Sequence, residues 1–352
     1  MEKVAKRLGR REVLLGTAGL GVGGVLAACT GNKKDSTPVT ISAAASNANS
    51  APGKTVTIGF SAPAADHGWI GAIAKNASAA SKQFSDVKLE AVQPTNDIAA
   101  QIAAVETLIN KKVDVIVMLP NDGKQLTAVA RKAMNAGIQV VNLDRIFDTP
   151  LAYRTWIGGD NYGMGVSAGN YIGDELKKKG VSNPVIAEVA GIDSLPLTQQ
   201  RSQGFRDSLA KYGFKVGPRQ AAQFTVQSGQ QVTASLLQSA PKIDAMWNHD
   251  DDQGVGVLAA VRQANRREFF MVGGAGSANA MREIKAGQGV LKATVLYPPT
   301  MAASAIQLGR LIVQTKGMSD LSQKEVPASI TLYSATVTKE NVDQYLPLGF
   351  ES

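Results

Sequence analysis

The sequence predicts an α/β protein with two domains, each built around a sheet of parallel strands, and three observations support this fold class. From residue 54 onward, short apolar runs suited to buried strands alternate with amphipathic helical stretches. Strand–helix–strand repetition produces parallel sheets with right-handed crossovers. The part of the chain with this pattern is about 300 residues long, which at roughly 150 residues per domain allows two domains.

The expected strands are short and apolar, and the expected helices carry apolar side chains on one face. The strands lie at 56–60, 113–119, 139–143, 185–189, 245–248, 269–272 and 291–296, and the helices at 68–84, 97–111, 124–136, 162–179, 199–212, 251–263 and 300–316. Asp97 is expected to cap the second of these helices. Because parallel sheets bind ligands outside the carboxyl ends of their strands, the polar residues that directly follow each strand are the candidates for function.

Residues 1–28 have the pattern of an export signal. Five Lys or Arg residues precede an uncharged run at 13–28, which is too short and too weakly apolar to span a hydrocarbon core of ~30 Å. Cys29 follows a Leu-Ala-Ala tripeptide, so the segment resembles the signal of a bacterial lipoprotein, whose cysteine carries lipid. The Arg pair at 10–11 fits twin-arginine export, and an ordinary Sec signal is the alternative. Residues 29–53, rich in Ser, Ala, Asn and Pro, are expected to form a flexible linker.

Composition argues against several classes of protein. One cysteine cannot form an internal disulfide or a cysteine-based zinc site, and two histidines leave little for a histidine-rich metal centre. The first 28 residues carry five Lys or Arg and two Asp or Glu, so the rest of the chain keeps a net charge of +5 out of +8. That mild excess does not indicate a nucleic-acid partner. The sequence has no G-x-S-x-G, H-E-x-x-H or Walker A motif, so an enzyme is not expected.

Charged and aromatic residues recur where the expected strands end. Asp66 and Trp69 follow the first strand, Asp144 and Arg145 follow the strand at 139–143, and Asp250 follows the strand at 245–248. Carboxylates accept hydrogen bonds from hydroxyls, guanidinium groups donate in a planar fork, and ring faces cover the C–H face of a sugar. This mixture suits a neutral, polyhydroxylated ligand.

Residues from about 54 to 340 resemble the periplasmic sugar-binding proteins of the ribose-binding type, which are the soluble receptors of ABC importers. The matching residues are the strand ending in Ser61, the strand 138–143 running into Asp144-Arg145, Gly159-Asp160-Asn161, Arg201 with Gly204-Phe205, and the strand end at Asp250-Asp251. The resemblance implies two similar α/β/α domains joined by a hinge of three chain crossings, with the ligand in the cleft between them. It places 54–158 and 298–326 in the first domain, and 159–297 and 327–352 in the second.

The resemblance also implies seven ligand contacts, four from the first domain and three from the second. They are Asp66, Trp69, Asp144, Arg145, Arg201, Phe224 and Asp250. Each has a structural alternative: the carboxylates and guanidiniums as helix caps, ion pairs or surface residues, and the rings as core packing. The run 250–252 also invites a metal, but successive residues at a helix start point in different directions. Capping plus one ligand contact is preferred there, and no metal or cofactor is expected.

Three positions depart from the ribose-type pattern. Leu119 stands where Asn is common, Ala275 where an Asp usually binds hydroxyls, and Tyr297 where a Gln lies at the hinge. The loss of an acidic acceptor at Ala275 argues against ribose itself. Asp66 and Asp250 stand where the family more often has Asn, which fits another sugar or a polyol.

Together these observations predict a monomeric lipoprotein, anchored through Cys29 to the outer face of the cell membrane or in the periplasm. It would capture a monosaccharide or related polyol and deliver it to an ABC permease. The first alternative is an accessory receptor that passes the sugar to a chemosensor or kinase. A sugar-responsive repressor shares the fold but needs a helix-turn-helix at the N-terminus, where this chain has its export pattern. A hydrolase is the remaining alternative.

Overall fold

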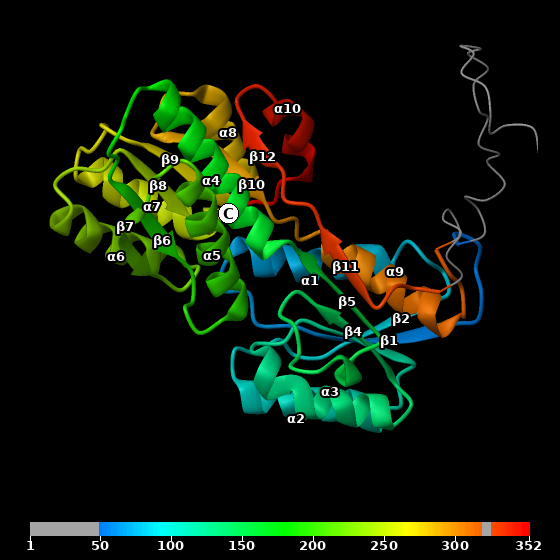
Figure 1. Ribbon diagram of the computed structural model, residues 1–352. Coiled ribbons are helices and arrows are strands. Elements are labelled where there is room, and N and C mark those ends of the chain that lie inside the picture. Colours follow the sequence, from blue (N-terminus) through cyan, green and yellow to red (C-terminus); the bar gives the residue numbers. More distant parts are fainter. Residues whose placement is uncertain (1–48, 319–324) are drawn as a thin grey trace, which may run out of the picture. The chain divides into compact units, whose positions relative to one another are not determined.

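The computed structural model describes residues 49–318 and 325–352 (Figure 1). The predicted export signal, Cys29 and the linker as far as residue 48 lie outside the described residues. None of the helices in the described part of the chain is long and apolar enough to cross a membrane.

The first domain is built on a six-stranded sheet in which every pair of neighbouring strands is parallel. Its strand order is β11 (Ser329–Leu332), β5 (Thr155–Gly159), β4 (Gln139–Leu143), β3 (Val115–Met118), β1 (Val56–Ser61) and β2 (Val87–Ala91). The helices are α1 (Gly68–Ser81), α2 (Ile98–Asn110), α3 (Gly123–Asn135) and α9 (Met301–Val313), and a 3-10 turn spans Pro150–Ala152.

The second domain has a six-stranded sheet of the same kind, with one antiparallel strand at its edge. Its order is β12 (Thr336–Thr338), β10 (Leu291–Leu296), β9 (Phe270–Ala275), β8 (Ala245–Asn248), β6 (Ile186–Ala190) and β7 (Val216–Ala221), and only β12 runs antiparallel to its neighbour. The helices are α4 (Asn161–Lys178), α5 (Pro196–Lys211), α6 (Val226–Ser239), α7 (Asp251–Gln263), α8 (Ala278–Ala286) and α10 (Val342–Tyr345), followed by a 3-10 turn over Leu346–Leu348.

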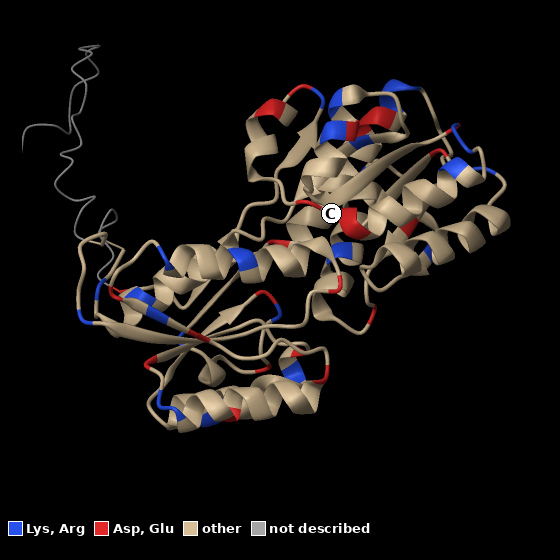
Figure 2. Cartoon of the chain, turned by 180° about the vertical axis from the view of Figure 1, so that it is seen from behind, with Lys and Arg blue, Asp and Glu red and all other residues tan. Residues whose placement is uncertain are grey.

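Each sheet is covered by helices on both faces because successive strand residues point to opposite sides. In β3, Val115 and Val117 pack with α1 and α9, whereas Ile116 and Met118 pack with α2 and α3. In the second domain, α4 and α5 cover one face, and α6, α7 and α8 cover the other. Figure 2 shows the charged residues mainly on loops and on the outer faces of helices, while the strands carry few of them.

The chain passes between the two sheets three times: after β5, after β10, and between β11 and β12. The predicted fold class is therefore confirmed, including the three crossings. The expected third boundary, between residues 326 and 327, is wrong by several residues. Because β11 pairs with β5 in the first sheet, Ser329–Leu332 belongs to the first domain, and the crossing follows Leu332.

The seven expected strands and seven expected helices are present, and their bounds differ by a few residues. Asp97 caps α2 as predicted, because its carboxylate accepts from the backbone N–H of Ala100 at 2.7 Å. The sequence did not predict β2, β5, β7, β11, β12, α6, α8 or the short α10. Of these strands, β2 and β7 lie at sheet edges with partly exposed residues, so neither shows the continuous apolar run of a central strand.

Candidate functional site

The candidate site is a chamber at the carboxyl ends of strands from both sheets. Its lining residues come from loops and helix starts that follow β1, β4, β6, β7, β8, β9 and β10. They are His67, Trp69, Asp144, Arg145, Leu197, Arg201, Phe224, Asp250, Ala275 and Tyr297.

The structure brings six of the seven predicted contact residues together in this chamber, and Asp66 lies outside it. Asp66 lines a neighbouring groove, where its carboxylate pairs with the Nδ1 atom of His67. His67, the following residue, reaches the chamber and is also the N-cap residue of α1, without a side-chain capping bond. The alternative that Asp66 caps this helix is therefore wrong.

Three residues of the chamber have a left-handed backbone. Asp144, Phe224 and Ala275 have φ angles of 63°, 62° and 79°. For residues other than glycine this conformation costs of order 1–3 kcal/mol, and it persists where the surrounding structure fixes it. Such residues concentrate at functional sites, so their meeting in one chamber supports its assignment as the ligand site.

The backbone and side chain of Asp144 are fixed by three neighbours. Its N–H donates to the carbonyl of Ile157 at 2.9 Å, and its carbonyl accepts from the indole nitrogen of Trp156 at 2.8 Å. Its carboxylate accepts from the hydroxyl of Tyr297. Among the described residues Asp144 makes no ion pair with Arg145, so the ion-pair alternative for these two residues is wrong. The carboxylate is held in place but keeps capacity to accept further hydrogen bonds from a ligand.

A chain of hydrogen bonds joins Asp144 of the first domain to Arg201 of the second. The Tyr297 hydroxyl, which donates to Asp144, lies 3.2 Å from the amide nitrogen of Asn161. The amide oxygen of Asn161 accepts from Nε of Arg201 at 2.9 Å. Tyr297 follows β10 and Asn161 begins α4, so both lie at chain crossings. Burial, together with the nearby Asp144 charge, raises the pKa of Tyr297 well above its usual value, so the phenol remains a proton donor. We call this chain, Asp144–Tyr297–Asn161–Arg201, the hinge relay.

Arg201 is buried and is held from several sides. Besides its bond in the hinge relay, its Nη1 donates to the carbonyl of His249 at 3.2 Å. Its guanidinium carbon lies 4.6 Å from the ring centroid of Tyr297 and 5.9 Å from that of Phe224. No hydrogen bond within the described part of the chain uses Nη2, which leaves donors for a ligand. The alternative of a surface residue is wrong for Arg201.

Arg145 reaches the chamber from the loop after β4. Its Nη1 donates to the carbonyl of Asn121 at 2.7 Å. Its Nε is buried and has no hydrogen-bond partner in the described residues. A buried donor without a partner is costly, and a ligand oxygen would satisfy it.

The three successive carboxylates at the start of α7 have three different sets of partners. Asp250 caps the helix by accepting from the N–H groups of Asp252 and Gln253, at 2.9 and 3.1 Å. Asp251 accepts from backbone N–H groups at the end of β9, and Asp252 accepts from the N–H of Trp69 at 2.8 Å. In the described chain no three His, Cys, Asp or Glu side chains are grouped so as to hold a metal ion. The predicted capping by Asp250 is confirmed.

Burial raises the pKa of Asp250 to about 7, and the neighbouring charge of Asp252 adds to this effect. One oxygen of Asp250 makes the two capping bonds, and the other makes no hydrogen bond within the described residues. Because Asp250 lines the chamber, this free oxygen is suited to a ligand hydroxyl.

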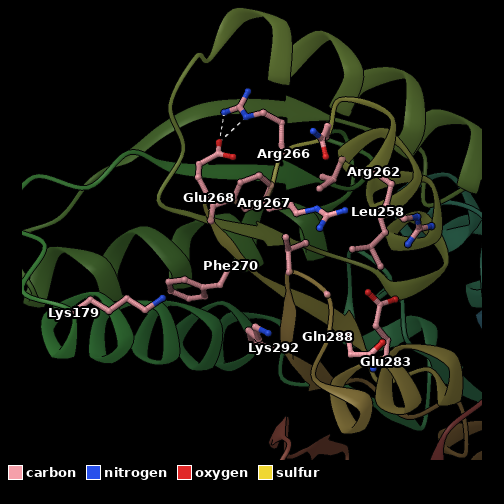
Figure 3. A pocket seen from close by; sticks show the side chains of 15 residues that line it. Lys179, Leu258, Arg262, Arg266, Arg267, Glu268, Phe270, Glu283, Gln288 and Lys292 are labelled. Atoms are coloured by element: carbon pink, nitrogen blue, oxygen red, sulfur yellow. Dashed lines mark hydrogen bonds and ion pairs between the residues drawn. The ribbon is translucent and has the colours of Figure 1, made fainter.

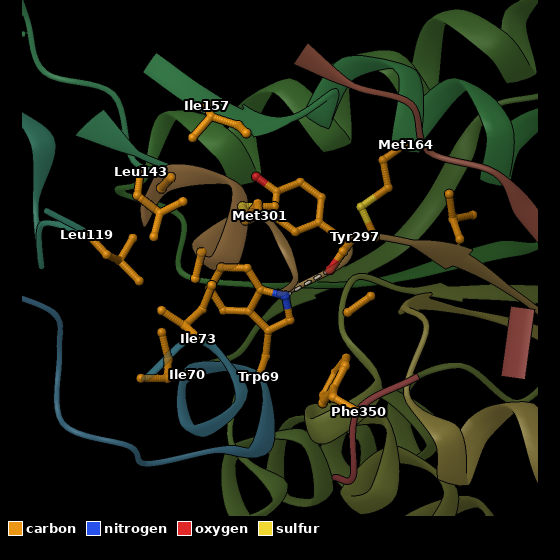
Figure 4. Close-up of a cluster of buried hydrophobic side chains, with 14 of the residues drawn as sticks. Trp69, Ile70, Ile73, Leu119, Leu143, Ile157, Met164, Tyr297, Met301 and Phe350 are labelled. Carbon is orange, nitrogen blue, oxygen red and sulfur yellow. Dashed lines mark hydrogen bonds between the residues drawn. The ribbon is translucent and has the colours of Figure 1, made fainter. Parts of the chain in front are cut away.

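Trp69 both packs in the core and lines the chamber. Its ring lies 5.8 Å from the ring of Tyr297, centroid to centroid, and its indole nitrogen donates to the Tyr297 carbonyl at 2.8 Å (Figure 4). Ile70 and Ile73 of the same helix lie in the same apolar cluster. Trp69 therefore packs in the core, as one of the two alternatives expected, and it also lines the chamber.

The second domain supports the chamber with a buried polar group behind Arg201. His249 is fully buried, and its Nε2 lies 2.9 Å from Oε1 of Glu188. Glu188 also accepts from the hydroxyl of Ser202 and faces Nε of Arg219 at 3.4 Å. Burial lowers the pKa of His249 despite its carboxylate partner. His249 contributes its backbone carbonyl to Arg201, and its ring packs against Trp247, 4.0 Å away between centroids.

Leu197, Ala275 and Tyr297 line the chamber but were not among the predicted contacts. The sequence held a clue for two of them, since Ala275 ends β9 and Tyr297 directly follows β10. Both would have been predicted as contacts if every residue at a strand end had been considered, whether charged or not.

A larger cavity, of about 850 Å³, lies in the second domain. Figure 3 shows that basic side chains line it, including Arg262, Arg266 and Lys292. It adjoins the amino ends of β9 and β10, and the ammonium nitrogen of Lys179 lies 4.3 Å from the ring centroid of Phe270. This cavity therefore lies away from the carboxyl ends of the strands, where parallel sheets bind ligands.

Comparison with known proteins gives a consistent result. A family model described as the periplasmic binding protein domain matches residues 58–317. The ribose import binding protein of Bacillus subtilis is 28% identical over 274 residues, which cover 76% of this chain and 87% of that protein. The D-ribose/D-allose-binding protein of Pseudomonas aeruginosa is 29% identical over 217 residues, or 61% of this chain and 68% of that protein.

Among solved structures, a protein from Mycobacterium smegmatis in complex with β-D-fucofuranose is similar throughout both domains. The sequences are 25% identical, the TM-score is 0.74, and the match covers 83% of this chain and 94% of that one. Both of the curated relatives are named as sugar-binding proteins.

The hinge relay predicts that the Tyr297 hydroxyl stabilises the fold. Tyr297→Phe removes the donor to the buried Asp144 carboxylate, so the free energy of unfolding should fall by about 1–3 kcal/mol. Urea unfolding measures this change. Tyr162→Phe is the matched control, because its hydroxyl bonds Asp207 at 3.0 Å on the exposed surface and its loss should change little. Equal stability of wild type and Tyr297→Phe would contradict the relay.

Proposed function

Because the chain belongs to the periplasmic binding protein family, we propose that it is an exported lipoprotein that captures a monosaccharide or related polyol and delivers it to an ABC importer. The observation that carries this proposal is the chamber, in which carboxylates, guanidiniums and aromatic rings from both domains face one small volume. The names of the similar proteins, which refer to ribose, allose and fucofuranose, support a neutral sugar.

The chemistry of the chamber suits a neutral ligand with several hydroxyls. The chamber contains two carboxyl groups, on Asp144 and Asp250, and two guanidiniums, on Arg145 and Arg201. Hydroxyls can donate to the carboxylates and accept from the guanidiniums, while the rings of Trp69 and Phe224 cover C–H groups.

The first test of this function is titration calorimetry with neutral pentoses, hexoses and polyols. At least one should bind, and Asp144→Asn and Arg201→Ala should each weaken it more than tenfold, since each leaves a buried ligand group without its partner. Asn is chosen at position 144 because it tolerates the left-handed backbone.

Arg206→Ala is the control for this test, because Arg206 lies on the same helix as Arg201, is exposed, and among the described residues bonds only Gln203. Thermal melts show whether each variant is folded. The absence of binding to every compound would contradict the function, and full affinity in both site variants would place the ligand elsewhere.

Ligand binding should also close the cleft between the domains. Trp69, Asp144 and Arg145 come from the first domain, and Arg201, Phe224 and Asp250 from the second, so a sugar reaches all of them only when the domains approach. A ligand shifts such an equilibrium by binding one state more tightly than the other. Gly158 and Gly159, at the first crossing, could absorb the rotation.

Small-angle scattering measures this closure. The radius of gyration should decrease when a saturating sugar is added, and a sugar that does not bind in calorimetry serves as the control. If the radius of gyration stays the same while calorimetry confirms binding, the predicted closure is wrong. The importer would then meet the same shape with and without sugar.

The export pattern supports attachment of the protein to the membrane through lipid on Cys29. Intact-mass spectrometry of the protein from membranes should find a chain that begins at Cys29 and carries lipid. A diacylglyceryl group has two acyl chains, which is enough for stable anchoring. Cys29→Ser should release the protein from the membrane fraction, and an unmodified chain beginning elsewhere would contradict this assignment.

A further inference from the structure

We propose that the ligand of the chamber is a deoxy sugar, with the carbon that lacks a hydroxyl placed against Ala275. This inference rests on the proposed function, because it assumes that the chamber binds a sugar. It concerns the end of β9, where Ala275 gives the wall of the chamber an apolar side chain.

The first step of the argument is the backbone of Ala275. Its φ angle is 79°, in the left-handed region that favours glycine, asparagine and aspartate. Its side chain is buried and lines the chamber. Asparagine or aspartate would fit this backbone more easily and would offer an oxygen to the ligand. Alanine offers a methyl group, so at this position the ligand meets an apolar surface.

The second step is that the carboxylate of Asp251, which holds the turn after β9, is already occupied. Oδ1 of Asp251 accepts from the N–H of Gly274 at 2.9 Å, and Oδ2 accepts from those of Gly276 and Ser277 at 2.9 and 2.8 Å. The hydroxyl of Thr294 bonds the same carboxylate at 2.9 Å. Asp251 therefore serves the turn after β9 and is not available to a ligand hydroxyl.

The third step is that the backbone at this strand end is also paired. The carbonyl of Ala275 accepts from the N–H of Tyr297 at 3.1 Å. Leu197 and Phe224 add further apolar surface to the chamber. A bound water needs two to four polar partners, which alanine and leucine side chains do not supply. The side chains of Ala275, Leu197 and Phe224 therefore offer a ligand hydroxyl no hydrogen-bond partner.

Polar groups of the chamber come from other elements. Asp144 and Arg145 follow β4, Arg201 lies on α5, and Asp250 follows β8. The ligand can therefore satisfy hydroxyls toward these groups while presenting hydrogen or a methyl group toward the end of β9. A sugar that lacks one hydroxyl matches this distribution better than its fully hydroxylated parent.

Titration calorimetry of the purified protein with matched sugar pairs tests the proposal. The pairs are D-fucose with D-galactose, L-rhamnose with L-mannose, and 2-deoxy-D-ribose with D-ribose. In at least one pair the deoxy sugar should bind about ten- to a hundredfold more tightly, which is the discrimination that an apolar pocket achieves against an added hydroxyl.

A variant shows whether Ala275 is responsible. Ala275→Asn supplies an amide oxygen and suits the left-handed backbone, so the preference within that pair should shrink at least tenfold. Lys112→Asn is the matched control, because Lys112 also has a left-handed backbone, with φ of 53°, but lies outside the chamber. Its selectivity should equal that of the wild type. If melting temperatures show that Asn crowds the site, Ala275→Ser adds a smaller acceptor.

The outcomes separate this proposal from the proposed function. If sugars bind but every parent sugar binds as tightly as its deoxy partner, the deoxy proposal is wrong and the sugar-binding function stands. An unchanged preference in folded Ala275→Asn and Ala275→Ser would likewise overturn it. If no sugar binds the wild type, the proposed function itself fails.

Discussion

The arrangement of the site depends on one constraint, which is that parallel strands bring their carboxyl ends to the same edge of a sheet. Both domains obey it, so residues far apart in the sequence, such as Asp144 and Tyr297, meet in one chamber. The hinge relay joins the two domains by hydrogen bonds. The Tyr297 hydroxyl bonds Asp144, and Asn161 bonds both Tyr297 and Arg201. A carboxylate of one domain and a guanidinium of the other are thereby oriented through residues at the chain crossings.

At the start of α7, three adjacent carboxylates accept hydrogen bonds from three different parts of the fold. Asp250 caps α7, Asp251 fixes the turn after β9, and Asp252 accepts from the first turn of α1 in the other domain. A carboxylate near a helix N-terminus is stabilised by the helix dipole. Burial nevertheless raises the pKa of Asp251 to about 8, because the ionised carboxylate is poorly solvated there. The gain is a fixed geometry beside the chamber.

Much of the fold could be predicted from the sequence because central parallel strands are buried on both faces and appear as continuous apolar runs. Edge strands such as β2 and β7 lack that pattern, and β5 contains two glycines, so these were missed. At the site, charged residues after strands were found easily, which is why Asp144 and Arg145 were predicted. Ala275 was noticed only as a departure from the family pattern, and Leu197 was missed because it resembles a core residue in sequence.

Two residues that line the chamber with apolar side chains, Phe224 and Ala275, have a left-handed backbone. Neither residue type favours such a conformation, so local preference does not explain either of them. Their side chains supply apolar surface to a chamber that also contains strongly polar groups, such as Asp144 and Arg201. A site with this division discriminates in two ways: its buried polar groups reject a ligand that lacks matching hydroxyls, and its apolar wall disfavours one with an extra hydroxyl. The first kind of discrimination is the stronger, because an unpaired buried polar group is more costly than an imperfectly placed methyl group. The polar half of the chamber should therefore define the class of sugar, and the wall at Ala275 should select within it.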